Sequence, residues 1–84
     1  MAFVDKVISS QGDYFYKVNA TDSTGRRAFY YILVDKVKLQ QFLTIKSDGR
    51  YDLADYGQIV ASGYGEEPTA DAKRLLKARY GFDF

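Results

Sequence analysis

Apolar and polar residues alternate along the first half of the chain with the two-residue period of β-strands. Residues 3–9 (FVDKVIS) form the first alternating run, and the turn-forming sequence SQGD follows at 10–13. Two further runs, 13–20 and 26–34, flank the loop sequence TDSTGR at 21–26. We therefore predict three strands here, of which the last two form a hairpin.

The hairpin loop contains the residues that set the pairing of its two strands. Asp22 is suited to begin a type I turn, and Gly25 can adopt the left-handed conformation that closes a short loop. A three-residue loop, Ser23–Gly25, places the even-numbered side chains of both strands on one face. The opposed pairs are Ala20 with Ala28, Val18 with Tyr30, and Tyr16 with Ile32. This face is almost wholly apolar, so we assign it to the core.

The odd-numbered face of the hairpin combines aromatic rings with cations. Its rings and cations are Phe15, Lys17, Arg27, Phe29 and Tyr31. If a helix packs on this face, the rings belong to the core. If the face is open, it is suited to bind a protein, or to bind single-stranded nucleic acid through base stacking and phosphate contacts.

Residues 36–46 fit two secondary structures. A helix capped by Asp35 places Leu39, Phe42 and Leu43 on one side. In a strand, the alternating apolar positions are Val37, Leu39, Leu43 and Ile45. We expect the helix, because the Gln and Lys residues of this segment favour it over a strand.

The segment that follows predicts three short features. The sequence SDGR at 47–50 is a turn, and YDLADYG at 51–57 is an irregular segment or a single helical turn. The sequence GQIVASGY at 57–64 predicts another strand.

A second helix is predicted over residues 69–80. Thr69 is suited to be its N-cap, or Pro68 its first residue, and Gly81 ends it. One side is lined by Ala72, Leu75 and Leu76, with Arg79 or Tyr80. The opposite side has the three cations Lys73, Arg74 and Lys77. This basic side is either a solvated helix face or a docking stripe for an acidic partner or a phosphate backbone.

Together these elements predict an α+β fold for a single domain that covers residues 1–84. We expect an antiparallel sheet of about four strands with two helices packed on one face. The other face is then open or covered by a partner, and it is the first place to look for function. The C-terminal rings Tyr80, Phe82 and Phe84 either fold back over the core or contact another chain.

The glycine-rich sequence GYGEEP at 63–68 precedes the second helix, where phosphates often bind. However, Glu66, Glu67 and Asp71 place carboxylates around the positive end of this helix, and the P-loop pattern is absent. We therefore predict backbone roles for Gly63 and Gly65. Each needs either a positive φ angle or a close approach by another group after the strand.

The residue types limit the chemistry of the chain. It has no Cys and no His, which excludes disulfides, Cys/His zinc sites, thiol nucleophiles and His-based triads. The acids Asp48, Asp52 and Asp55 lack the alternate spacing and the closing Glu of a calcium-binding loop. We expect no catalytic residue, no cofactor and no metal site.

Charge and hydropathy favour a small interaction protein. The net charge is +1, so no strong overall field attracts nucleic acid or a membrane. No apolar run has the length of a signal peptide or a transmembrane helix, and we expect a cytoplasmic protein that does not contact membranes.

We predict a non-catalytic protein-interaction or accessory module whose partner is another protein or a second copy of the chain. The candidate interaction surface comprises Phe15, Lys17, Arg27, Phe29, Tyr31, Lys73, Arg74 and Lys77. The alternative function is single-stranded nucleic-acid binding through the odd-numbered hairpin face and the basic helix.

Overall fold

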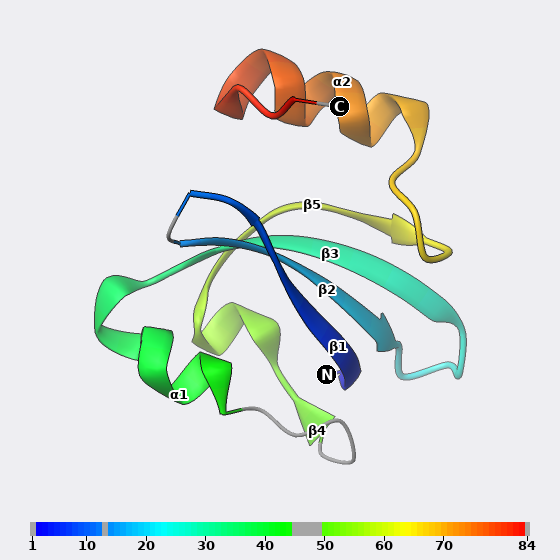
Figure 1. Ribbon diagram of the computed structural model, residues 1–84. Helices are drawn as coiled ribbons and strands as arrows, with labels where there is room; N and C mark the ends of the chain where they lie inside the picture. Colours follow the sequence, from blue (N-terminus) through cyan, green and yellow to red (C-terminus); the bar gives the residue numbers. More distant parts are fainter. Residues whose placement is uncertain (1, 13, 45–49, 84) are drawn as a thin grey trace.

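A five-stranded antiparallel sheet forms the centre of the protein, with helix α2 on one face and helix α1 on the other (Figure 1). The computed structural model describes residues 2–12, 14–44 and 50–83. The strand order is β4-β1-β2-β3-β5.

The strands are β1 (Ala2–Gln11), β2 (Phe15–Thr21), β3 (Arg27–Val34), β4 (Arg50–Tyr51) and β5 (Gly57–Tyr64). The helices are α1 (Leu39–Leu43) and α2 (Ala70–Tyr80), and the 3₁₀ turns are η1 (Lys36–Lys38) and η2 (Leu53–Asp55). The predicted α+β fold is confirmed.

The hairpin of β2 and β3 has the predicted loop and the predicted register, with Ala20 opposite Ala28. Asp22 organises the loop, because its Oδ1 accepts hydrogen bonds from the Thr24 hydroxyl (2.6 Å), the Thr24 N–H (2.9 Å) and the Arg26 N–H (3.0 Å). The Thr24 hydroxyl is the main cause that lowers the pKa of Asp22 below its ordinary value. Gly25 has a φ of +87°, the left-handed conformation that was predicted for it.

The even-numbered face of the hairpin belongs to the core, as predicted, and α1 covers part of it. The buried members of this cluster are Val4, Val18, Ala20, Ile32, Val34, Phe42 and Leu53. Phe42 connects α1 to the sheet: its ring centroid lies 5.4 Å from that of Tyr16 and 5.9 Å from that of Tyr56. Both tilted ring geometries are favourable for aromatic packing.

The odd-numbered face is a second core layer beneath α2. Its buried members are Phe29, Tyr31, Ala72, Leu76 and Phe82. The ring centroid of Phe82 lies 5.6 Å from that of Tyr31 and 5.4 Å from that of Phe15. The C-terminal segment therefore folds back over the core, which was one of the two outcomes expected from the sequence.

The placement of the two helices on opposite faces differs from the expectation that both would share one face. The physical reason lies in β3, whose sequence RAFYYILV is apolar on both faces. Two helices on the even face would leave the rings of Phe29 and Tyr31 in water. Burial of one such side chain stabilises a protein by about 1.5–3 kcal/mol, so one helix on each face gives the larger gain.

The segment after β3 is helical, as predicted, but its α-helical part is short. Asp35 is the N-cap residue of η1, as predicted, but its side chain makes no capping hydrogen bond. Phe42 is buried, whereas Leu43 on the predicted apolar side is 49% exposed. Residues 45–46 of the predicted helix, and 47–49 of the predicted turn, lie outside the described residues.

Helix α2 begins and ends as the sequence predicted. Thr69 is its N-cap, and the Thr69 Oγ1 accepts a hydrogen bond of 3.2 Å from the N–H of Ala72. Gly81 has a φ of +72° and reverses the chain, which returns Phe82 to the core. Phe84 lies outside the described residues.

Gly63 and Gly65 have the backbone roles that the sequence predicted. A Cβ atom on Gly63 would lie 2.8 Å from Cε1 of Phe29, closer than carbon atoms pack. Gly65 has a φ of +97°, a conformation that side chains rarely adopt. Gly63 therefore allows the Phe29 ring to lie against β5, and Gly65 allows the chain to turn toward α2.

The substitution Gly63→Ala is expected to destabilise the protein by about 1–3 kcal/mol, because the added methyl group overlaps the buried Phe29 ring. Thermal unfolding followed by circular dichroism measures this loss. Ser62→Ala is the matched control at an exposed position of the same strand, with an expected change of at most about 0.5 kcal/mol. Equal melting temperatures for the two variants would contradict the close packing at Gly63.

Candidate functional site

The structure separates the residues that the sequence analysis grouped as one interaction surface. Phe29 is fully buried and Tyr31 is 3% exposed, both beneath α2. Phe15 is half-buried and packs against the rings of Tyr80 and Phe82. These rings serve the core, which is the first of the two interpretations that the sequence left open.

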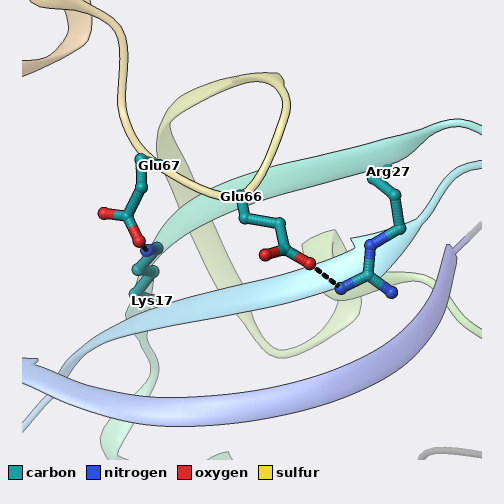
Figure 2. Close-up of polar contacts among 4 residues, drawn as sticks. All are labelled: Lys17, Arg27, Glu66 and Glu67. Atoms are coloured by element: carbon teal, nitrogen blue, oxygen red, sulfur yellow. Dashed lines mark hydrogen bonds and ion pairs between the residues drawn. The ribbon is translucent and has the colours of Figure 1, made fainter.

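The two cations of the odd-numbered face anchor the connection between β5 and α2 (Figure 2). The Arg27 Nη2 lies 2.5 Å from Oε1 of Glu66, and the Lys17 Nζ lies 3.5 Å from Oε1 of Glu67. The Lys17 side chain is only 12% exposed, so its ammonium group is held close to the sheet. The carboxylates that disfavour phosphate thus bind the β2–β3 hairpin, and the exposed Arg27–Glu66 pair contributes up to about 1 kcal/mol.

The basic side of α2 is exposed, as the sequence predicted. Lys73, Arg74 and Lys77 all face solvent, and the Arg74 Nη1 lies 3.9 Å from Oδ1 of Asp71. Because α2 covers the odd-numbered rings, these cations lie on the outer layer of the molecule. They do not form one continuous surface with the rings of the sheet.

Among the described residues, the outer edge of β5 is an unpaired backbone surface that the local sequence pattern did not reveal. This strand pairs with β3 on one side, and in the described part of the chain its other side has no neighbouring strand. Its sequence GQIVASGY contains neither a charged residue nor Pro, the two residue types that commonly protect a sheet edge. A bulge at Val60 interrupts its register with β3.

Exposed apolar side chains flank this edge on both faces of the sheet. Ile59 pairs with Ile32 on the even-numbered face and is 37% exposed. Leu75 of α2 is also 37% exposed, above the other face. At 3.6 residues per turn, Leu75 lies about 140° around the helix axis from Tyr80. Because Tyr80 contacts Phe15 of β2, Leu75 lies on the side of α2 that faces the β5 edge.

The C-terminal end of β5 presents a partly exposed aromatic group. Tyr64 is 55% exposed, and the guanidinium carbon of Arg26 lies 3.7 Å from the centroid of its ring. A cavity of about 240 Å³ beside it is lined by Asp22, Ala28, Tyr30, Ser62, Gly63 and Tyr64. Burial, followed by the charge of Asp22, raises the pKa of Tyr30 above its ordinary value.

We call the outer edge of β5, together with the exposed side chains of Ile59, Tyr64 and Leu75, the β5 edge strip. The strand itself was predicted from the sequence, and its lack of charge was the one available signal. Its edge position depends on pairing between segments far apart in the chain, which local patterns do not encode.

The pH dependence of stability tests the burial of the odd-numbered rings. Burial raises the pKa of the Tyr31 phenol, and the carboxylate of Glu67 adds to this effect. The unfolded chain therefore releases this proton at a lower pH than the folded chain does. The protonated Tyr31 phenol therefore contributes to the free energy of unfolding in full below about pH 10. This contribution is lost as the pH rises through the pKa of Tyr31 in the folded protein.

Tyr31→Phe removes the titrating hydroxyl and keeps the ring, so this variant is expected to lose less stability than the wild type between about pH 9 and pH 11. Urea unfolding at several pH values measures the difference. Parallel curves of stability against pH for the two proteins would show that Tyr31 does not ionise differently in the two states.

Within residues 2–12, 14–44 and 50–83, no helix has the length and apolar character needed to cross a membrane. In the same part of the chain, no cluster of three or more acidic, His or Cys residues is placed to hold a metal ion. Comparison with protein-family models, curated proteins and solved structures finds no match to the chain. The function proposed below is therefore derived from the molecular surface alone.

Proposed function

We propose that the protein is a small non-catalytic interaction module that binds a protein partner along the β5 edge strip. The observation that carries this proposal is the uncharged outer edge of β5, which has no neighbouring strand in the described structure. Its N–H and C=O groups can pair with an extended segment of another protein. Such addition of a strand to a sheet edge is a common mode of recognition.

The side chains around the edge add apolar contact to the backbone pairing. Ile59 and Leu75 flank β5 on opposite faces, so a bound strand covers apolar surface on both. Tyr64 extends this contact area at one end of the strand, and tyrosine is a residue type enriched at protein interfaces. Backbone hydrogen bonds to a partner replace hydrogen bonds to water, so their net contribution to affinity is small. Burial of the apolar side chains supplies the larger part of the binding free energy.

Charge substitution on either side of the edge is expected to weaken the interaction. Ile59→Lys and Leu75→Lys should each reduce partner capture in a quantitative pull-down by about fivefold or more, which corresponds to about 1 kcal/mol. The reason is that a lysine beside the edge must be desolvated when a strand is added.

The same change at exposed apolar positions outside the strip provides the matched controls. Val37 is 88% exposed on η1 and Leu43 is 49% exposed on α1, so Val37→Lys and Leu43→Lys should retain wild-type capture. Circular dichroism confirms that all four variants fold. Unchanged capture by both edge variants, or equal losses in edge and control variants, would contradict binding at the β5 edge strip.

A second candidate function, nucleic-acid binding, is favoured by the three exposed cations of α2. Because Phe29 and Tyr31 are buried, this binding would depend on phosphate contacts and not on base stacking at these rings.

Fluorescence anisotropy with labelled single-stranded oligonucleotides tests the second candidate. Three phosphate contacts predict that the logarithm of the binding constant falls with the logarithm of salt concentration with a slope of about −2. The double variant Lys73→Gln/Lys77→Gln should flatten this slope. Absence of binding at about 20 mM salt, where phosphate contacts are strongest, would remove the candidate.

A further inference from the structure

We infer that the occupant of the β5 edge strip is a second copy of this chain, whose β5 pairs antiparallel with the first across a two-fold axis near Val60. This inference rests on the interaction function proposed above, and it specifies the partner. The two five-stranded sheets then form one continuous sheet with the two β5 strands at its centre. Closed two-fold dimers of this kind are the commonest form of protein oligomer.

The position of Leu75 favours a second copy over a bare extended peptide. Leu75 is adjacent to Leu76, and the partly buried Val60 and Ala61 of β5 pack against the cluster that contains Leu76. Leu75 therefore lies near the proposed axis, on the outer side of α2. An axis perpendicular to the sheet keeps both α2 helices on the same face, so the two Leu75 side chains meet above the paired strands. A bare peptide covers the backbone edge but brings no second helix to cover Leu75.

The charges at the two ends of β5 favour the antiparallel orientation. The strand itself is uncharged, so self-pairing sets no like charges opposite each other. Arg26 lies at the C-terminal end of β5 through its contact with Tyr64, and the exposed Asp55 lies two residues before the N-terminal end. Antiparallel pairing brings Arg26 of each copy toward Asp55 of the other. Parallel pairing would instead bring Arg26 toward Arg26 and Asp55 toward Asp55.

The bulge at Val60 limits the strength of the dimer. It disturbs the regular row of N–H and C=O groups, so the strands pair in two short ladders related by the axis. Two short ladders and a few apolar contacts form an interface at the small end of the specific range. We therefore expect a dissociation constant of about 10–100 μM, and a monomer–dimer equilibrium that depends on concentration.

Light scattering after size exclusion, together with sedimentation equilibrium, measures this association from about 5 to about 500 μM, a range that brackets the expected dissociation constant. The wild-type mass should rise from 9.6 kDa toward twice that value as the concentration increases. Ile59→Lys and Leu75→Lys should remain at the monomer mass, whereas Val37→Lys and Leu43→Lys should associate like the wild type.

Cysteine cross-linking locates the axis without a change of charge. The chain contains no cysteine, so a single introduced thiol can form a disulfide only between copies. Leu75→Cys should form a covalent dimer under mild oxidation at least about tenfold faster than Leu43→Cys, because only Leu75 faces its counterpart near the axis. Equal rates for the two variants would contradict the proposed geometry.

The outcomes distinguish this inference from the function on which it rests. A wild-type mass of 9.6 kDa at about 500 μM, or a dimer that both edge variants leave intact, would overturn the second copy as occupant. If the protein is monomeric but the edge variants still lose capture of another protein, the interaction function stands and this inference fails. If the edge variants change neither self-association nor capture, both fail.

Discussion

The register of β2 with β3 is the constraint on which both layers of the core depend. Side chains alternate between the two faces of a strand, so a shift by one residue would move every side chain of the shifted strand from one core layer to the other. The hydrogen bonds to Asp22 and the left-handed Gly25 hold the loop at the length that prevents this shift. With this register, Ile32 meets the α1 layer and Phe29 meets the α2 layer. The same register directs Lys17 toward the loop before α2.

Local signals were sufficient to predict the hairpin, the N-cap at Thr69 and the turn at Gly65, because each depends on a few neighbouring residues. The face on which each helix packs was not predictable in this way. An amphipathic helix has an apolar side, but its sequence does not state which face of the sheet that side meets. The apolar character of β3 on both faces was the only signal that each face needed its own helix.

The candidate site shows the same division between local and long-range information. The mixture of rings with Lys17 and Arg27 on the odd-numbered face looked like a binding surface when it was considered alone. Arg27 instead pairs with Glu66, which lies 39 positions later in the chain. The edge position of β5 likewise arises only when this strand pairs with β3. A surface formed by segments that are far apart in the sequence can therefore be identified only in the folded chain.

The two edges of the sheet differ in their regularity, and this difference favours pairing through β5 over pairing through β1. On the side away from β5, β4 (Arg50–Tyr51) covers only one end of β1. Two irregularities interrupt the register of β1 with β2. Irregularities of this kind oppose the addition of a strand. Pairing through β5 uses the uncharged edge of each copy, so the edges that the dimer presents are those formed by β1 and β4. The bulge at Val60 keeps that pairing reversible, because it shortens the continuous ladders that the two strands can form.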